Sequence, residues 1–505
     1  MSKTRQLIIF ILGVALFFAC KTTVPVVEVA PPTDLEKINS EISQVSITSH
    51  LEFLASDALK GRDTGSDGLE AAAAYIASHF RRYGLSEVGG TYFQGVPFVA
   101  FDPPASAKMT AGDIELDFPT DFIAINGSAL NTAEAATIFI NYGSEEDLAG
   151  KDLTGKVVVS KAGDGISTAP IEWVEISRKK RQTVIDAGGV ALIEIYQSRA
   201  IPWRFLRSFG TSKQTTVSDG KAHTDLPNLW VGTTDSLTIA RLEDDTVPVS
   251  IEMGRVGRDQ FTSDNVMAMI PGTDPTLRDE YIVYSAHYDH VGVGRADADG
   301  DTIYNGARDN GVGTSAILSI AQYFSKNPPK RSSLFVLFTA EEKGLLGSRY
   351  FTENLPVEAS DIKFNFNIDN AGYNDTTLIT VFGMERTGVQ EEITSSCAEL
   401  GLSALEDPAP EQGLFDRSDN VNFAVLGIPA PTFSLGFTAF NDAIFKFYHQ
   451  PGDEVHTLDM DYVEKYIKAY ILSAIKIANA DSTPFWIEGD KYYDAGIELY
   501  GMTKG

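Results

Sequence analysis

The sequence predicts an α/β fold in which helices flank a mixed, mostly parallel central sheet. Three short apolar runs, 281–286, 333–340 and 364–368, are rich in β-branched and aromatic residues, which indicates buried strands. Two longer segments, 69–83 and 457–480, place apolar residues at helical spacing on one face. Strands that are apolar along their whole length suit a parallel sheet that is covered on both faces.

Residues with metal-binding side chains lie at the ends of these strands. They are His287, Glu341, Glu342 and Asp369. In open α/β sheets the carboxyl ends of the strands line the ligand crevice, so we expect a site at this edge. Asp309 fits the same pattern, because it lies in a glycine-rich loop, 305–313, just before a predicted helix. Glycines there let a carboxylate and the backbone approach a metal closely.

Five candidate metal ligands emerge from this pattern: His287, Asp309, Glu342, Asp369 and His449. Imidazole and carboxylate are usual zinc ligands, and a catalytic zinc keeps about three protein ligands and an open position for water. Five ligands serve two Zn²⁺ ions if one carboxylate bridges them, a role that suits Asp309. Two such ions can hold a hydroxide and polarise a carbonyl oxygen.

The pair Glu341-Glu342 supplies both a ligand and a base. Consecutive side chains diverge, so Glu342 can bind metal while Glu341 stays free to accept and return a proton. A Glu-Glu pair taken alone is more often a solvated turn. Its position directly after a predicted buried strand favours the catalytic interpretation.

Two histidine assignments stay open at this level. His290 competes with His287, which we favour because it directly follows the predicted strand, and His456 competes with His449, which the run 448–453 favours. Asp289, between the first pair, is expected to fix the orientation of a ligand.

The motifs at 287–289, 306–311, 338–348, 367–369 and 448–453 together resemble the zinc aminopeptidase and glutamate carboxypeptidase family, including bacterial leucyl aminopeptidases. The resemblance implies the phosphorylase/hydrolase-like fold of zinc exopeptidases. It also implies that His287, Asp309 and Asp369 bind one zinc, and that Asp309, Glu342 and His449 bind the other. By the same resemblance, Glu341 matches the catalytic base and Tyr448 matches a tyrosine that stabilises the oxyanion.

The N-terminus has the features of an export signal. Lys3 and Arg5 precede an apolar run, 7–19, that is short for a membrane span. Cys20 follows, and the arrangement resembles a bacterial lipoprotein signal in which residues 1–19 are removed and Cys20 is lipidated. Ordinary signal-peptidase cleavage and an uncleaved anchor are the alternatives. We expect a location in the bacterial cell envelope, attached to a membrane and facing the periplasm or the exterior.

The remaining chain divides into five predicted parts. They are a tether at 20–34, the N-terminal part of the peptidase domain at 35–116, a segment resembling a protease-associated domain at 117–255, the zinc peptidase catalytic domain at 256–485, and a tail at 486–505. The tail has no predicted role. After lipidation of Cys20 only Cys397 remains, so no internal disulfide is expected.

Charge limits the possible partners. The formal net charge of −28 becomes −30 when Lys3 and Arg5 leave with the signal peptide, which argues against nucleic-acid binding. A peptide substrate is expected, and no protein partner is inferable. The predicted function is a zinc-dependent exopeptidase, an aminopeptidase. The alternatives are a carboxypeptidase, dipeptidase or glutaminyl cyclase of the same family, and a receptor-like binding protein without catalysis.

Overall fold

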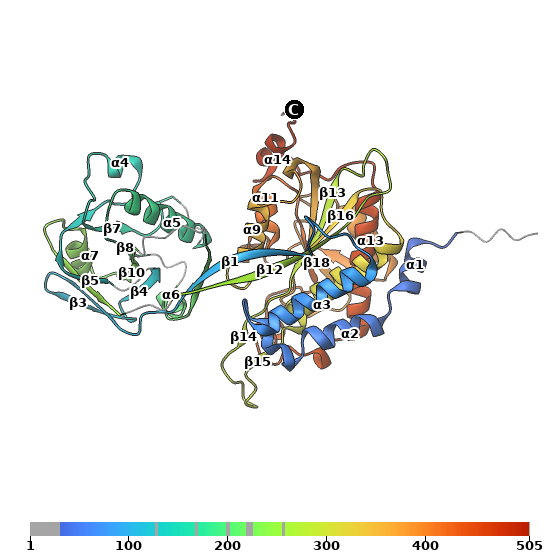
Figure 1. The fold of residues 1–505 in the computed structure, drawn as a ribbon, viewed down its shortest axis with the longest axis horizontal. Coiled ribbons are helices and arrows are strands. Elements are labelled where there is room, and N and C mark those ends of the chain that lie inside the picture. The colour runs from blue at the N-terminus through green and yellow to red at the C-terminus, as the bar shows by residue number, and fades with distance from the viewer. Residues whose placement is uncertain are drawn as a thin grey trace, which may run out of the picture.

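The computed structural model describes residues 31–126, 130–166, 170–197, 202–218, 226–254 and 258–503. Figure 1 shows a larger lobe and a smaller lobe. β1 (Phe93–Phe101) and β12 (Arg258–Ile270) form an antiparallel pair that connects them. The predicted signal peptide, Cys20 and most of the predicted tether lie outside the described residues.

The larger lobe is built on a nine-stranded sheet with the order β19-β18-β20-β17-β13-β16-β12-β1-β9. At its centre β13 (Tyr281–His287) pairs in parallel with β16 (Ser332–Phe338) and with β17 (Ile362–Ile368). The other strands are β9 (Gln214–Val217), β18 (Leu378–Phe382), β19 (Ser403–Leu405) and β20 (Thr432–Leu435). Antiparallel pairs flank the parallel centre. The predicted fold class is confirmed.

Helices cover both faces of this sheet. Side chains alternate between the two faces along each strand, so neighbouring residues of one strand pack into different cores. Tyr284 of β13 packs into one core with α3 (Asp67–Tyr83), α8 (Gly313–Lys326) and α13 (Met460–Asn479). The next residue toward the N-terminus, Val283, joins the opposite core with α9 (Leu346–Glu353) and α11 (Asn420–Val425). The remaining helices of this lobe are α1 (Asp34–Glu41), α2 (Gln44–Leu54), α10 (Gln390–Glu399), α12 (Asp442–Phe445) and α14 (Tyr493–Leu499).

Short helical turns and one hairpin complete the larger lobe. The turns are η1 (Asp57–Arg62), η2 (Ala307–Val312), η3 (Ala359–Asp361), η4 (Pro410–Gln412), η5 (Leu414–Arg417) and η6 (Val455–Thr457). The hairpin pairs β14 (Gly292–Val293) with β15 (Ile303–Tyr304).

The smaller lobe holds two further sheets, with orders β4-β10-β8-β7-β6 and β3-β2-β11-β5. Their strands are β2 (Ala107–Ala111), β3 (Ile114–Asp117), β4 (Phe122–Asn126), β5 (Leu130–Ala135), β6 (Thr137–Phe139), β7 (Val157–Lys161), β8 (Ala191–Tyr196), β10 (Asn228–Gly232) and β11 (Val249–Met253). The helices are α4 (Glu145–Leu148), α5 (Pro170–Asp186), α6 (Trp203–Gly210) and α7 (Ser236–Glu243). Apolar residues of both sheets share one core. The assignment of 117–255 to a protease-associated domain stays a prediction.

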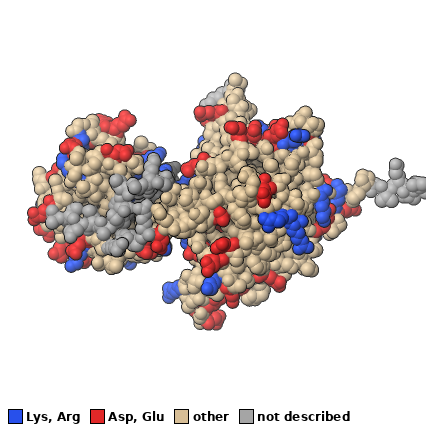
Figure 2. All heavy atoms as spheres, viewed as in Figure 1, with Lys and Arg blue, Asp and Glu red and all other residues tan. Residues whose placement is uncertain are grey.

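Acidic side chains are spread over both lobes on the face drawn in Figure 2, and the net charge of the whole chain is −28. None of the helices in the described part of the chain combines the length and apolarity needed to cross a bilayer.

Candidate metal centre and active site

His287 and Asp369 meet at one edge of the central sheet. His287 is the last residue of β13, and Asp369 directly follows β17, the parallel neighbour of β13. Nε2 of His287 lies 3.3 Å from Oδ1 of Asp369, and the histidine is 1% exposed. The other ring nitrogen, Nδ1, lies 3.1 Å from the backbone carbonyl oxygen of Asp289. Asp289 therefore contacts this imidazole through its main chain and turns Nε2 toward the carboxylates.

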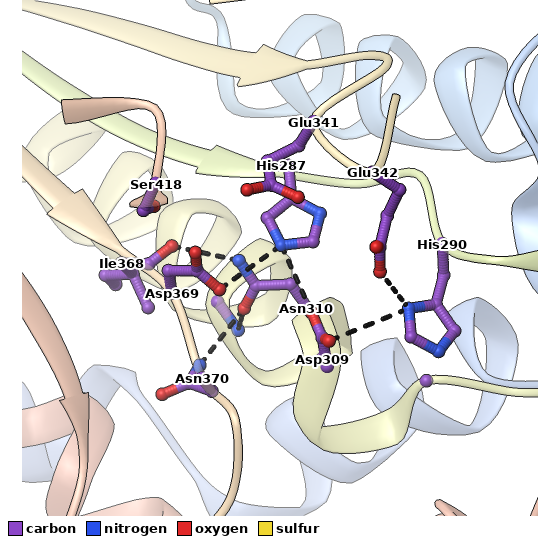
Figure 3. A network of polar contacts seen from close by, with 12 residues as sticks. His287, His290, Asp309, Asn310, Glu341, Glu342, Ile368, Asp369, Asn370 and Ser418 are labelled. Atoms are coloured by element: carbon purple, nitrogen blue, oxygen red, sulfur yellow. Dashed lines mark hydrogen bonds and ion pairs between the residues drawn. The ribbon is translucent and has the colours of Figure 1, made fainter. Parts of the chain in front are cut away.

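Asp309 stands between two histidines. Its Oδ1 lies 3.2 Å from Nε2 of His287, and its Oδ2 lies 3.1 Å from Nε2 of His449. The preceding turn needs a glycine at Gly306, where φ is +58° and a Cβ would lie 2.2 Å from the carbonyl oxygen of Asp309. The next residue, Asn310, donates its side-chain amide to the carbonyl oxygen of Ile368 at 2.9 Å (Figure 3). This bond ties the loop to the end of β17.

Glu341 and Glu342 diverge from a tight turn after β16. The turn begins at Ala340, where φ is +56°, and the amides of Gly344 and Leu345 donate back to the carbonyl oxygen of Glu341. Figure 3 shows the Glu341 side chain beside His287 and the Glu342 side chain directed toward His290. The two side chains therefore face different parts of the cluster, and their division into base and ligand stays a prediction.

His449 comes from a late loop that is fastened to the loop of Asp309. Its Nε2 lies 3.2 Å from Oε1 of Glu342, and its backbone has a φ of +51°. Four residues further, Asp453 accepts hydrogen bonds from the amide and the guanidinium of Arg308, at 2.9 and 2.8 Å. Arg308 and Asp453 are both buried, so this ion pair holds the two loops in register.

Two groups of potential metal donors result, and they share Asp309. One contains His287, Asp309 and Asp369, and the other contains His290, Asp309, Glu342 and His449. Within each group the donor atoms lie within 4.8 Å of one another. His290 is fully buried with its Nδ1 2.7 Å from Oε1 of Glu342, whereas His456 is exposed and lies outside both groups.

The electrostatics of the cluster follow from its excess of carboxylates. Burial lowers the pKa of His287, but Glu341, Asp309 and Asp369 outweigh that effect and raise the pKa well above its ordinary value. Burial also lowers the pKa of His449, yet Glu342 and Asp309 raise it to about 10. Burial raises the pKa of Glu341 well above its usual range, against the opposing charge of His287. Such a cluster is suited to a divalent cation, which would offset the negative charge.

A pocket opens beside the cluster. Its lining includes Asp309, Glu341, Glu342, Asp369 and His449. The rest of its lining is mainly apolar and aromatic, with Ala371, Phe382, Leu414, Arg417, Ser418, Thr432, Ser434, Phe437, Phe440 and Tyr448. The Tyr448 ring stacks on the His449 ring with centroids 4.1 Å apart. Four of the five candidate ligands, together with Glu341 and Tyr448, thus line one opening, and His287 lies behind them against Asp309 and Asp369.

Arg62 and Thr64 also position the cluster, although sequence reasoning did not select them. Arg62 is 1% exposed and donates to the backbone carbonyl oxygens of Tyr288, Leu54, Asn305 and Gly306. Thr64 donates to Oδ2 of Asp289 at 3.1 Å, and Oδ1 of Asp289 accepts the amide of Glu341 at 3.1 Å. The sequence feature that could have pointed to these two residues is the turn-forming run Gly-Arg-Asp-Thr-Gly at 61–65.

Comparison with known proteins places this site in a family. Residues 265–473 match the model of peptidase family M28. The chain contains a peptidase family M28 domain. This domain includes all five candidate ligands, Glu341 and Tyr448, while Arg62 precedes it. The resemblance to the zinc aminopeptidase family is thereby confirmed.

Relatives of the M28 domain include bacterial aminopeptidases. Aminopeptidase YwaD of Bacillus subtilis is 28% identical over 204 residues, which cover 39% of this chain and 41% of that protein. The chain thus spans less than half the length of that relative. The probable lipoprotein aminopeptidase LpqL of Mycobacterium tuberculosis is 23% identical over 416 residues, 78% of this chain and 74% of that protein.

A solved structure shares the fold. The aminopeptidase from Aneurinibacillus sp. strain AM-1 superposes with a TM-score of 0.58 at 20% sequence identity, covering 90% of this chain and 98% of that one. The structural similarity therefore extends beyond residues 265–473, which match the M28 model.

Proposed function

We propose that this chain is a zinc-dependent aminopeptidase that removes N-terminal residues from peptides, with two zinc ions held at the cluster around Asp309. The observation that carries the proposal is the placement of the two Asp309 oxygens, one facing His287 and the other facing His449. A carboxylate so placed is suited to bridge two cations. The names of the bacterial aminopeptidases among the relatives support the same activity.

The residues present fit zinc. Both donor groups consist of imidazole and carboxylate, the ligand types that zinc prefers beside thiolate. His287, Asp309 and Asp369 would hold one ion, and Asp309, Glu342 and His449 would hold the other. His290 would donate to Glu342 and fix the direction of that ligand. Bound zinc would supply Lewis-acid polarisation of the scissile carbonyl and activation of water.

Glu341 would move the proton. It lies among the carboxylates but is assigned to neither donor group, and it borders the pocket. Its side chain, beside His287 and bordering the pocket, is placed to take a proton from water and pass it to the leaving amine nitrogen. Tyr448, on the pocket wall, would help to stabilise the developing oxyanion.

Replacement of Glu341 by Gln tests the proposal. We expect turnover of aminoacyl anilides to fall by about 100-fold or more, because general-base catalysis contributes on that order. Zinc content should stay near two per chain, whereas Glu342→Gln should lose zinc. The exposed Glu353→Gln is the matched control and should behave like the wild type. Full turnover in Glu341→Gln would move the base role elsewhere, and a wild type that binds no zinc and cleaves neither anilides nor peptides would refute the proposed function.

We also propose that the mature chain is attached to a membrane through a lipid on Cys20. The apolar run before this cysteine supports the proposal, as does the name of the mycobacterial relative. Labelled palmitate should enter the wild type expressed in a bacterial host, and Cys20→Ala should abolish the label. The Cys397→Ala control should retain it, because Cys397 is buried. Equal labelling of wild type and Cys20→Ala would contradict the anchor.

A further inference from the structure

The segment 486–492, part of the tail without a predicted role, packs against a wall of the pocket. We call η5 (Leu414–Arg417) the pocket wall and residues 486–492 the C-terminal brace. Trp486 is 2% exposed and donates its indole N–H to the carbonyl oxygen of Gly427 at 2.9 Å. The brace and the pocket residues Phe382, Leu414, Phe437, Phe440 and Tyr448 belong to one continuous apolar cluster.

The pocket wall presents its first and last residues to the pocket and its two middle residues to the brace. In a 3₁₀-helix, residues three apart lie on the same face. Leu414 and Arg417 have this spacing, and both line the pocket. The two residues between them, Phe415 and Asp416, contact the brace instead.

The contacts of Phe415 and Asp416 are specific. The Phe415 ring lies 6.2 Å from the Trp486 ring and 6.0 Å from the Tyr492 ring, between centroids. The Tyr492 hydroxyl donates to Oδ1 of Asp416 at 2.9 Å, and Lys491 forms an ion pair with the other oxygen. Asp416 is therefore held by two neighbouring residues of the brace.

Arg386 connects the brace to the end of β18, which also borders the pocket. It follows β18, whose last residue, Phe382, lines the pocket. Its guanidinium donates to both carboxylate oxygens of Asp490, at 2.6 and 3.2 Å, and lies 4.0 Å from the centroid of the Phe415 ring. The brace thus reaches the pocket wall and the end of β18 together.

We propose that the C-terminal brace sets the selectivity of the pocket by holding Leu414 and Arg417 in place, with Trp486 and Tyr492 as positioning residues. This inference rests on the proposed function, because selectivity is read from hydrolysis. The brace touches none of the metal-binding candidates in any described contact, so it should act on substrate fit and leave zinc binding unchanged.

The test removes one hydroxyl. We expect Tyr492→Phe to lower kcat/KM for leucyl and phenylalanyl anilides by about three- to tenfold, the range of a lost hydrogen bond, and to change alanyl anilide by less than about twofold. The effect should fall mainly on KM, with zinc content unchanged. Asp416→Ala should give the same shift in selectivity. The double variant should add little to Asp416→Ala, since both single changes break the hydrogen bond between Tyr492 and Asp416.

Tyr500→Phe is the matched control. Its hydroxyl also comes from the C-terminal tail, but it donates to the carbonyl oxygen of Ile362 at 2.6 Å, away from the pocket. Hydrogen exchange over residues 410–420 gives a second readout, which should rise in Tyr492→Phe and not in Tyr500→Phe. Equal loss on all three anilides, or the same result in both variants, would overturn the proposal. If the wild type cleaves no anilide or peptide, the proposed function fails, and unchanged exchange over 410–420 would then separately overturn the brace.

Discussion

Single side chains decide how the loops of the site meet. Arg62 extends from η1 in the N-terminal part of the chain to main-chain oxygens on both sides of the cluster, at Tyr288 and at Asn305 and Gly306. A guanidinium offers five donors in a fixed planar arrangement, which an ammonium group lacks. It also brings a buried positive charge close to Asp289, Asp309, Asp453 and Glu342.

We therefore expect Arg62→Lys to weaken zinc retention by about 10- to 100-fold, the range seen when groups that orient metal ligands are lost. Competition with a chelator measures the change without any assay of activity. Arg331→Lys is the control, since Arg331 is equally buried but lies before β16, at the opposite edge of the sheet, and pairs with Glu280. Equal zinc retention in both variants would show that Arg62 serves stability alone.

We expect His50, which belongs to neither donor group, to make stability depend on pH. It is 3% exposed, with Nδ1 2.8 Å from the Tyr75 hydroxyl and its ring beside that of His79. Burial, followed by the charge of His79, lowers the pKa of His50 from 6.5 to about 4. Because the unfolded chain binds this proton more readily, its contribution to stability is present above pH 6.5 and is lost as the pH falls toward 4.

The pKa difference corresponds to about 3 kcal/mol. We expect the free energy of unfolding in urea to fall by about that much more in the wild type than in His50→Gln between pH 7.5 and pH 4. His456→Gln, at an exposed position, should follow the wild type. A His50→Gln profile parallel to that of the wild type would contradict the assignment.

Elements with a strong apolar pattern were predictable from sequence. The runs 281–286, 333–340 and 364–368 became β13, β16 and β17, and the predicted helix at 69–83 is α3, which ends before Gly84 with a φ of +80°. Burial on both faces gives such strands their continuous apolar character. The same logic placed polar residues at the strand ends, where the structure brings them together.

Elements whose shape depends on distant partners were not predictable. Nothing in the spacing of Arg62 indicates its bonds to residues more than 200 positions away. In the sequence the brace shows only scattered aromatic residues. Its position in the fold depends on contacts that involve Arg386 and Phe415. Likewise, the sequence run around His449 favoured it over His456, but nothing in that run indicates that Asp453 pairs with Arg308 and fastens this loop to the loop of Asp309.

At the scale of the whole molecule, the smaller lobe is inserted into an intact hairpin. β1 and β12 pair along their length, and Phe101 lies opposite Arg258 at the point where the chain leaves for the smaller lobe. The chain leaves and returns at adjacent positions, so the insertion does not interrupt the centre of the sheet. β9 is the exception, because it pairs with β1 from within the inserted stretch.

This geometry allows the lobe to be removed cleanly. Replacing residues 102–257 by Asn-Gly should close β1 and β12 with a two-residue turn, the connection that suits antiparallel strands. Loss of β9 leaves β1 as an exposed edge, so solubility should fall before zinc binding does. All candidate ligands lie outside the removed stretch, and we expect near two zincs per chain and anilide turnover close to that of the full chain.

Cleavage rates on substrates of different lengths should show whether the smaller lobe takes part in substrate selection. If the smaller lobe restricts access to the pocket, its removal should raise the rate on peptides of about ten residues relative to anilides by about tenfold, or 1.4 kcal/mol. Anilides are too small to meet the lobe, so they serve as the internal reference. An unchanged ratio, with zinc content retained, would mean that the lobe takes no part in choosing substrates and that selection rests with the pocket and its C-terminal brace.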